Sequence, residues 1–494
     1  MNAGRGAAKT NWWFVAGCVL IVFLAHTPLF ALPYFWDELG QFVPAALDVL
    51  HDGAWIPHST VPNAHPPGVM AYLATAWRIF GYSIPATRAA MLVLASGAVV
   101  ATFLLSNRLI GAAGFVSLIP ALLLVIDPLF YMQAMMAQLD MPAMLFTLLA
   151  LILFLQDRHA AAALACAALV LSKETGALLP LLFAAALLCE RRTRFAWYYL
   201  APFGALGLWF FALWRGTGQL FGDAGFTHYN LEYALNPVRA SLSLIRRVYY
   251  LCIADFRWAG FLAILFAWRR STIYSGRAWR IIWIFVAAHT LMVSVLGGAE
   301  LERYLLPVIP LLYIAMGAAW TTLGPIWRTA SMATVAAGLL VGLFVNPPFP
   351  FPFENNLAMV DFVRLHRGAA QFLEQAYPSE TIHTAWPLTA ALRNPAFGYV
   401  DRKMSAAETS DLRYSTLAAL DPKAVHVLVL YSRTWEPSWG VLRWPIVTRF
   451  LARFYEYGRQ MNSSEVREHF GLVPVQRWDR RGQWIEIYAR QPAL

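Results

Sequence analysis

The chain has 494 residues, of which 59% are hydrophobic and only 13% are charged, and its formal net charge is +10. Soluble domains carry roughly a quarter charged residues, so this composition excludes an ordinary soluble protein. The basic residues lie mainly at the ends of loops and in the tail, which argues against a nucleic-acid-binding protein.

Apolar runs of about the length of a membrane-spanning helix, roughly 20 residues, recur along most of the chain before residue 346. The first run is too long for a signal peptide and no small-residue cleavage site follows it, so we interpret it as a retained helix. Several runs are short, which is typical of broken or tilted helices around a cavity. The sequence predicts about eleven spans, at residues 12–33, 88–106, 110–127, 139–155, 159–172, 175–189, 196–214, 248–268, 281–296, 304–320 and 329–346.

The loop after the first span, residues 34–87, is unusually long, and such loops are usually functional. Residues 45–50 and 70–80 have patterns that predict short amphipathic helices on the membrane surface. The loop opens on YFWDELGQF, which places Asp37 and Glu38 where the first span leaves the membrane. A carboxylate at the edge of the hydrocarbon is costly, so the pair is either functional or a solvated loop start that caps the next helix.

Positive charge predicts the orientation of the spans. If the N-terminus is cytoplasmic, every inner loop is basic, and the inner loops hold only two acids, Asp157 and Glu190. An odd number of spans then places the C-terminus on the outer, extracytoplasmic side. The inner basic residues are Arg5, Lys9, Arg108, Arg158, Arg191, Arg192, Arg194, Arg269, Arg270, Arg277, Arg280 and Arg328.

A proline-rich stretch, NPPFPFPFENN at 346–356, predicts a boundary between two domains. We expect a membrane domain at 1–348, including the loop 34–87, and a soluble C-terminal domain at 349–494. The predicted fold is therefore mostly α: a polytopic membrane protein with a small C-terminal α/β domain. In the C-terminal domain we expect a helix at 357–376 and strands at 381–386, 425–431 and 483–489.

Several short stretches together carry a likeness to a known family. WDELGQFVPAALDVLHDGAWIPH and NAHPPGVMAYLATAWRIFG lie in the first loop, and QLDMPAMLF (138–146), SKETGALLP (172–180) and ERYLLPVIP (302–310) follow. In this order and spacing they resemble the motifs of the GT-C superfamily of lipid-dependent membrane glycosyltransferases. The likeness is to bacterial members similar to protein O-mannosyltransferases (family 39) and to lipid A aminoarabinose transferases (family 83). The tail resembles the soluble domains of bacterial members only loosely.

The resemblance implies a sugar donor carried on a polyprenyl phosphate, with its lipid in the bilayer and its sugar at the outer surface. An acceptor hydroxyl attacks the anomeric carbon while the phosphate departs. The resemblance implies Asp37, Glu38 and Asp140 as catalytic acids, and we expect Asp37 to be the base that takes the acceptor proton. Because phosphate is a good leaving group, donors that steady its charge suffice. The residues expected to bind the donor phosphate are His65, Lys173, Arg303 and Tyr304.

Each of these residues also has a structural alternative. Asp140 could cap the helix that Pro142 opens, Lys173 could pair with the adjacent Glu174, and His65 could cap a turn. Arg303 could pair with its neighbour Glu302. Four further outer-side arginines could bind a second phosphate or an interfacial lipid, and we favour instead a snorkelling rim. They are Arg239, Arg246, Arg247 and Arg257.

The sequence predicts no metal site. Where the family 83 transferase has a glutamate tied to a bound metal, this chain has Ala64, so the resemblance does not extend to that ion. The histidines give no ligand spacing typical of zinc, and we expect no cofactor, with a divalent metal left open. The spacing of the four cysteines fits neither zinc nor disulfides, and they are expected to pack in or beside the spans: Cys18, Cys166, Cys189 and Cys252.

The expected function is inverting transfer of a sugar from a polyprenyl phosphate to an envelope acceptor, on the periplasmic face of the inner membrane. The acceptor classes are lipid A or lipopolysaccharide core, another glycan, and an exported protein. One alternative is an oligosaccharide ligase or polymerase that uses polyprenyl diphosphate. Another is a transporter of lipid-linked sugars, but transporters usually show paired halves and this sequence shows none. A receptor scaffold would leave Asp37, Asp140 and Arg303 unexplained.

Overall fold

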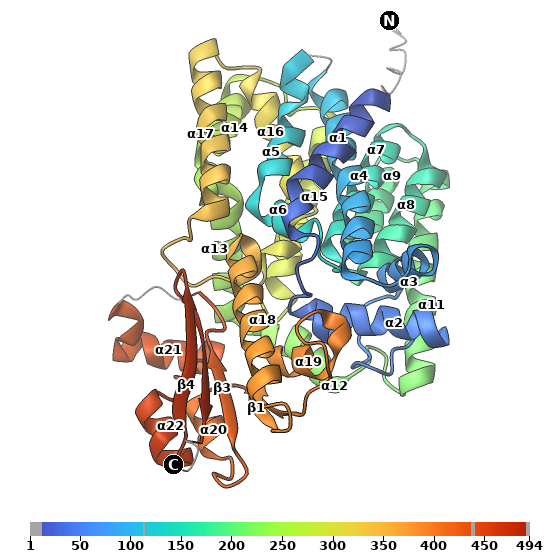
Figure 1. Cartoon of the computed structure of the whole chain (residues 1–494). Coiled ribbons are helices and arrows are strands. Elements are labelled where there is room, and N and C mark those ends of the chain that lie inside the picture. The colour runs from blue at the N-terminus through green and yellow to red at the C-terminus, as the bar shows by residue number, and fades with distance from the viewer. Residues whose placement is uncertain (1–11, 112–113, 436–439, 491–494) are drawn as a thin grey trace, which may run out of the picture.

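The computed structural model of the chain describes residues 12–111, 114–435 and 440–490. Arg5 and Lys9, two of the predicted inner-side cations, lie outside these ranges. A tall body of helices sits above a small domain with a β-sheet, and the first helix begins near the end of the body that is far from the sheet (Figure 1). The prediction of a mostly helical, polytopic membrane protein with a small C-terminal α/β domain is confirmed.

The chain enters the body through α1 (Trp12–His26) and η1 (Thr27–Leu29). A π-helical turn, η2 (Glu38–Phe42), continues into α2 (Val43–Asp52), which ends at Gly53 in the left-handed conformation. A long connection then leads to α3 (Gly68–Phe80), which packs on α2 near the lower end of the body (Figure 1). The two short helices predicted at 45–50 and 70–80 are thus present, each slightly longer than predicted.

The rest of the body is helical. Ser83 caps α4 with its side chain, and Asp127 caps α6 in the same way, because a hydroxyl or carboxylate can accept from the free N–H groups of a first turn. The elements are α4 (Ile84–Ile110), η3 (Gly114–Ser117), α5 (Ile119–Ile126), α6 (Pro128–Gln133), α7 (Asp140–Leu155), α8 (His159–Ser172), η4 (Glu174–Ala177), α9 (Leu178–Cys189), α10 (Thr193–Ala196), η5 (Trp197–Tyr199), α11 (Leu200–Thr217), α12 (Ala224–Thr227), η6 (His228–Glu232), η7 (Tyr233–Leu235), α13 (Pro237–Cys252), η8 (Ala254–Phe256), α14 (Trp258–Arg270), α15 (Arg277–Val295), η9 (Glu302–Leu305), α16 (Ile309–Trp320) and α17 (Pro325–Phe344).

Apolar helices match ten of the eleven predicted spans. Among the described residues, four stretches are long and apolar enough to cross a membrane: Ile84–Ile110, Thr193–Thr217, Arg277–Val295 and Pro325–Phe344. Six shorter apolar helices correspond to the other matched spans: Val15–Leu29, Phe115–Ile126, Asp140–Leu155, His159–Ser172, Glu174–Cys189 and Ile309–Trp320.

The predicted span at 248–268 is wrong as a single helix. The structure divides it between α13 and α14, with Asp255 and Phe256 in the left-handed region at φ 50° and 57°. Arg257 follows this break and is buried, where it binds Asp127 at 2.6 Å. The sequence carries a signal for this break, because Asp255 and Arg257 place two charges in the middle of the predicted span.

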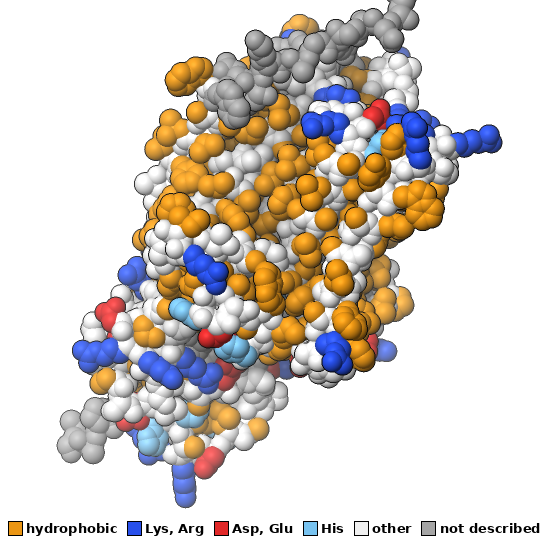
Figure 2. Space-filling view, turned by 90° about the vertical axis from the view of Figure 1, so that its right-hand side faces the viewer, with side chains coloured by type: hydrophobic (Ala, Val, Ile, Leu, Met, Phe, Trp, Pro, Cys, Tyr) orange, Lys and Arg blue, Asp and Glu red, His pale blue; other side chains and the backbone are white. Residues whose placement is uncertain are grey.

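The flank of the helical body carries a broad apolar surface. Figure 2 shows hydrophobic side chains across the middle of this face, with Lys and Arg side chains toward its two ends. Leu208, Trp327 and Ile326 are among the large hydrophobic side chains left exposed on the body. Exposed apolar surface on this scale is typical of a protein in contact with lipid.

The C-terminal domain is built on a mixed five-stranded sheet with the order β2-β1-β3-β5-β4. β1 pairs in parallel with β2 and β3, and β5 pairs antiparallel with β3 and β4, with Leu428 opposite Tyr488. The helix α18 packs on β4 and β5. The elements are η10 (Phe353–Asn355), α18 (Ala358–Ala376), β1 (Ile382–Ala385), α19 (Leu388–Arg393), η11 (Pro395–Phe397), β2 (Ala406–Thr409), α20 (Tyr414–Ala418), β3 (Val427–Tyr431), η12 (Gly440–Arg443), α21 (Pro445–Tyr455), α22 (Ser463–Phe470), β4 (Val473–Arg480) and β5 (Gln483–Ala489).

The C-terminal domain docks directly on the motif that follows α1. The ring of Trp386 meets Trp36 edge to face, with centroids 4.7 Å apart. A Cβ added at Gly40 would lie 2.9 Å from the Trp386 ring, so only glycine fits there without a shift. The Tyr399 hydroxyl donates to the carbonyl oxygen of Tyr34 at 2.7 Å. The domain therefore helps to fix the backbone that carries Asp37.

Candidate active site

A cavity of about 690 Å³ lies between the helical body, the first loop and the C-terminal domain. Six of the seven predicted site residues line it; Glu38 is the exception. They come from segments as far apart as residues 37 and 304, so the fold brings together what the sequence separates. The six are Asp37, His65, Asp140, Lys173, Arg303 and Tyr304.

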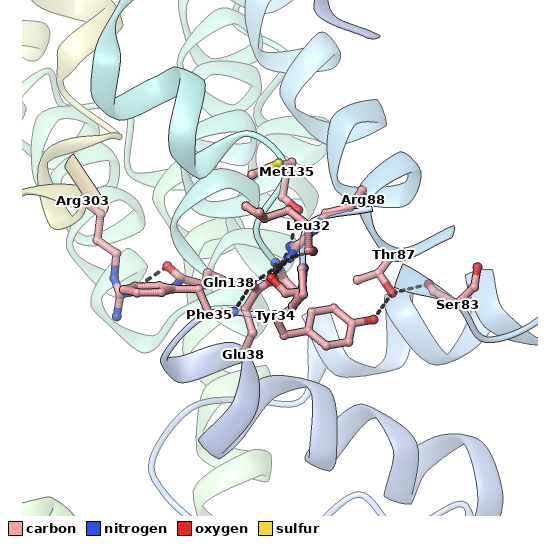
Figure 3. A network of polar contacts seen from close by, with 12 residues as sticks. Leu32, Tyr34, Phe35, Glu38, Ser83, Thr87, Arg88, Met135, Gln138 and Arg303 are labelled. Atoms are coloured by element: carbon pink, nitrogen blue, oxygen red, sulfur yellow. Dashed lines mark hydrogen bonds and ion pairs between the residues drawn. The ribbon is translucent and has the colours of Figure 1, made fainter. Parts of the chain in front are cut away.

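Arg303 joins the carboxylates of the cavity. It lies in η9, is 4% exposed, and contacts Asp37 through one terminal nitrogen. Its other terminal nitrogen donates to Gln138 at 2.7 Å and to Glu354 at 2.9 Å. Its Nε lies 3.3 Å from Asp140. Figure 3 shows Arg303 beside Gln138. One guanidinium therefore holds three carboxylates, which suits its planar, multiply donating geometry.

Lys173 forms the second cationic point of the site. Its Nζ lies 2.5 Å from Oδ1 of Asp140 and 4.1 Å from the centroid of the Tyr304 ring. The N-cap of α7 is Leu139 and no side chain caps it, so the alternative of Asp140 as a helix cap is wrong. Lys173 pairs with Asp140, whereas its neighbour Glu174 pairs with His65. An ammonium group on the cavity wall can bind an anionic group of a ligand.

His65 lies on another part of the cavity wall. Its Nδ1 is 2.9 Å from the Glu174 carboxylate, and its ring meets Phe226 edge to face. Its backbone N–H donates to the Asn63 side chain at 3.0 Å. The imidazole is thus oriented by a carboxylate through Nδ1.

Glu38 has a different environment from its neighbour. It is fully buried and binds Arg88 through both carboxylate oxygens. Backbone N–H groups of Phe35 and Ala137 donate to it at 2.8 and 2.7 Å. Figure 3 shows Glu38 and Arg88 enclosed among the ends of several segments. Because it does not line the cavity and its oxygens are bonded, we assign Glu38 a structural role instead of the predicted catalytic one.

The backbone turns sharply just before the two adjacent carboxylates, at Trp36, which has a left-handed φ of 45°. A non-glycine residue rarely adopts this conformation and needs support from its surroundings. That support comes from aromatic packing against Trp386 and Phe362 of the C-terminal domain. Asp37 follows the turn with a 17% exposed side chain on the cavity, while Glu38 lies inside the protein.

Sequence reasoning missed Glu354. It lies in η10, within the proline-rich connection that was interpreted only as a domain boundary, and it lines the cavity at 3% exposure. Burial raises the pKa of its carboxyl to about 7, aided by Asp37 and Asp140 and opposed by Arg303. The sequence did carry a signal for Glu354, because it is the one acid that directly follows an apolar Phe-Pro run.

The four arginines predicted to face the outer side do not form a snorkelling rim. Arg239 and Arg247 are 4% and 1% exposed, and both donate to backbone carbonyls, those of Gly298 and Val293 at 2.8 Å. Arg257 is also buried, in its ion pair with Asp127. Arg246 lines the cavity and pairs with Glu302, which leaves Arg303 free of that neighbour. Buried arginines are paired because an unpaired buried charge is costly.

The remaining cavity wall is largely aromatic and apolar. It includes Phe210, Phe221 and Tyr229, and the C-terminal domain adds Arg433, whose guanidinium lies 5.6 Å from the centroid of Trp36. A pocket with an apolar wall and a few convergent charged groups is typical of a site for an amphiphilic ligand.

One group of three potential metal ligands occurs in the described part of the chain. Asp48, Asp52 and His58 offer ligand atoms within 4.8 Å of one another. None of the three lines the cavity, and Asp48 already accepts from the backbone N–H groups of His58 and Ser59. The carboxylates of the cavity contact Arg303 and Lys173. The expectation of a reaction without a cofactor stays a prediction.

Comparison with known proteins bears on the fold. The crystal structure of ArnT from Cupriavidus metallidurans bound to undecaprenyl phosphate is 16% identical, with a TM-score of 0.59, over 97% of this chain and 98% of that chain. The apo structure of the same ArnT is 15% identical, with a TM-score of 0.56 and the same coverage. The chain has the GT-C fold. No protein-family model and no curated protein matches the sequence.

The shared GT-C fold covers both domains, since the match extends over nearly the whole of each chain. The structural likeness therefore includes the C-terminal domain, whose sequence resembles those of the family only loosely. At 16% identity it establishes the arrangement of the elements, and the chemistry of the cavity must be argued from the residues of this chain.

Proposed function

We propose that the protein is an inverting glycosyltransferase that moves a sugar from a polyprenyl phosphate to an acceptor of the cell envelope. The acceptor classes remain those expected from the sequence: lipid A or lipopolysaccharide core, another glycan, or an exported protein. We place the reaction at the periplasmic face of the inner membrane.

The observation that carries this proposal is the convergence of six motif residues, from Asp37 to Tyr304, on one cavity. The cavity combines carboxylates with cations on one wall and aromatic rings on another, as a sugar phosphate on a lipid requires. The GT-C neighbour bound to undecaprenyl phosphate supports a polyprenyl-linked donor.

The proposed roles follow the chemistry of the donor. Lys173 and His65 steady the phosphate as it departs, and Tyr304, whose ring packs against the ammonium of Lys173, is assigned as a hydrogen-bond donor to the phosphate. The sequence predicts that Arg303 binds the donor phosphate. Its contacts give it a second role, which is to hold Asp37, Asp140 and Glu354 in place. Two tasks then fall to the carboxylates: taking the acceptor proton and stabilising positive charge on the sugar.

The proposal includes a membrane domain at 1–348 and an extracytoplasmic domain at 349–494. The sheet domain and the cavity lie at one end of the helical body, and α1 begins near the other end (Figure 1). Reporter fusions after residues 37 and 303 test this orientation, because both must report the extracytoplasmic side. A cytoplasmic signal from either fusion would contradict the proposed orientation.

A deletion strain tests the function most directly. We expect mass spectrometry to find one polyprenyl-phosphate sugar accumulating and one envelope glycan or glycoprotein lacking that sugar. Accumulation of a polyprenyl diphosphate oligosaccharide would favour a ligase or polymerase instead. A lipid-linked sugar trapped on the cytoplasmic face, with transfer still occurring in opened membranes, would favour a transporter.

A further inference from the structure

One buried carboxylate oxygen on the cavity wall lacks a partner. Glu354 binds Arg303 through Oε2 at 2.9 Å, whereas its Oε1 makes no hydrogen bond within the described part of the chain. The side chain is 3% exposed and lines the cavity. Leaving a buried acceptor unsatisfied is destabilising, so Oε1 is suited to a hydrogen-bond donor that a ligand brings.

The other two carboxylates of the cavity are differently engaged. Asp140 has one oxygen on Lys173 at 2.5 Å and the other 3.3 Å from Arg303. Asp37 contacts Arg303 and retains a partly exposed side chain on the cavity. Glu354 is thus the carboxylate with an oxygen that is both buried and unbonded, which is where an incoming hydroxyl finds a free acceptor.

The groups around Glu354 determine how readily it exchanges a proton. Arg303 faces it with positive charge, whereas Asp37, Asp140 and Glu302 contribute negative charge. Burial and these like charges bring the pKa of its carboxyl to about 7. A general base is most effective when its pKa lies near the working pH.

We propose that Glu354 is the catalytic base of the transfer reaction and that Asp37 stabilises the positive charge that develops on the sugar. This inference rests on the proposed function, and it reassigns the base role that the sequence predicted for Asp37. The connection between the two domains then supplies a catalytic group and is more than a linker.

The proposed step balances within the site. The acceptor oxygen forms a bond to the anomeric carbon, and the bond from that carbon to the phosphate oxygen breaks, with its electron pair leaving on the polyprenyl phosphate. The acceptor proton moves to Oε1 of Glu354. The carboxyl later returns this proton to water, and Arg303 holds Oε2 throughout.

The first test is the pH profile of Glu354→Gln. Membranes that contain each variant are supplied with the polyprenyl-phosphate sugar that accumulates in the deletion strain, and its consumption is followed by mass spectrometry. We expect the variant to lose roughly 10²–10⁴-fold in rate. For the native protein, the rate falls as the pH falls through about 7, because the carboxylate becomes protonated; the variant loses this dependence.

Glu468→Gln is the matched control, because Glu468 is an exposed carboxylate of the same domain on α22 and does not line the cavity. It should retain the native rate and pH profile. Near-native transfer by Glu354→Gln would overturn the inference. So would loss of the pH dependence in Asp37→Asn while Glu354→Gln keeps it, since that result returns the base role to Asp37.

A second test needs no substrate. Infrared difference spectra of the purified protein, from about pH 5 to about pH 9, should contain the carbonyl stretch of a carboxylic acid that Glu354→Gln lacks. Unchanged difference spectra in the variant would overturn the inference even if transfer is impaired. If Glu354→Gln does not fold, Glu354→Asp replaces it and should keep the titration while transfer slows.

The two tests separate the inference from the proposed function. If the native protein consumes no polyprenyl-phosphate sugar, the proposed function fails, and the catalytic role of Glu354 fails with it. If the native protein is active and Glu354→Gln is equally active, only the role of Glu354 fails.

Discussion

Asp37 and Glu38 are adjacent in the chain and lie in two different ion-pair clusters. Glu38 has both oxygens on Arg88 and two backbone N–H groups, and it is completely buried. Asp37 shares Arg303 with two other carboxylates at the wall of a cavity of about 690 Å³. The first cluster has matched charges and is sealed. The second has more acids than its arginine can neutralise, and it faces open space.

This difference separates a structural acid pair from a reactive one. A buried pair with every group bonded positions the backbone, as the Glu38–Arg88 pair positions the chain between α1 and α4. Carboxylates crowded beside a cavity keep free acceptor capacity, and burial raises the pKa of one of them, Glu354; both are properties of catalytic sites. The sequence alone places both acids in one motif and cannot distinguish them.

The largest expected effect is the loss of transfer rate caused by Asp37→Asn. The change preserves shape but removes the negative charge that faces the sugar, so we expect a loss of roughly 10²–10⁴-fold in rate with undecaprenyl phosphate still bound. Rates in membranes and binding of undecaprenyl phosphate by native mass spectrometry measure this. Asp52→Asn, in the same loop but exposed, is the control. Near-normal turnover would remove Asp37 from the reaction.

Changes to the sealed Glu38–Arg88 cluster should lower the free energy of unfolding. Arg88→Met leaves Glu38 buried without its cation, and breaking a buried pair in this way costs about 3–5 kcal/mol. Thermal unfolding in detergent measures the loss. The double change Glu38→Gln with Arg88→Met should be less harmful than Arg88→Met alone, since no charge remains unpaired. Additive losses would argue against coupling between the two side chains.

Arg303→Lys sharpens the comparison from the cationic side. Lysine keeps the charge but cannot span three carboxylates, and losing charge-assisted hydrogen bonds of about 1.5–3 kcal/mol corresponds to a loss of roughly 10–100-fold in kcat. Arg303→Ala should in addition weaken the apparent affinity for the donor. Rates at several donor concentrations separate the two effects. If donor affinity stays native in Arg303→Ala, Arg303 does not contact the phosphate.

The smallest expected effect concerns the contact between the C-terminal domain and the motif. Tyr399→Phe removes the hydrogen bond to the carbonyl of Tyr34, which is worth about 1 kcal/mol. We expect a modest fall in thermal stability and a small reduction in transfer, because the turn at Trp36 loses one of its supports. Tyr414→Phe, at an exposed residue of the same domain, is the control. A rate loss as large as that of Asp37→Asn would mean that the domain controls the carboxylate far more tightly.

Much of the membrane domain was predictable because the lengths of its apolar runs indicate where the helices lie. Ten of eleven spans and the long helix α18 match, and so do the strands β1, β3 and β5. β2 is only four residues long, and β4 is VPVQRWDR, whose polar side chains on an edge strand give no apolar alternation. At the break after α13, Arg257 forms an ion pair with Asp127, which lies 130 positions earlier in the chain. The sequence does not show this pairing.

The site was predictable where a family motif marked it. Six of seven chosen residues line the cavity, because the motifs record side chains that converge in space. Glu38 was placed there because it is the second acid of the Asp–Glu pair in the family motif; its partner Arg88 stands at the edge of a predicted span, and no periodicity connects them. Glu354 was missed because a proline-rich stretch indicates a linker, and its proximity to Arg303 exists only in the folded chain.

The position of Glu354, between α17 and α18, limits how this protein can be rearranged. The junction of a chimera with a distant homologue decides which parent supplies the residue at position 354. If the C-terminal domain is exchanged before residue 353, the homologue supplies that residue. If it is exchanged after residue 356, Glu354 of this chain is kept. Glu354 and Arg303 must therefore come from the same parent in a chimera, because η10, the first turn of the C-terminal domain, binds an arginine of the helical body.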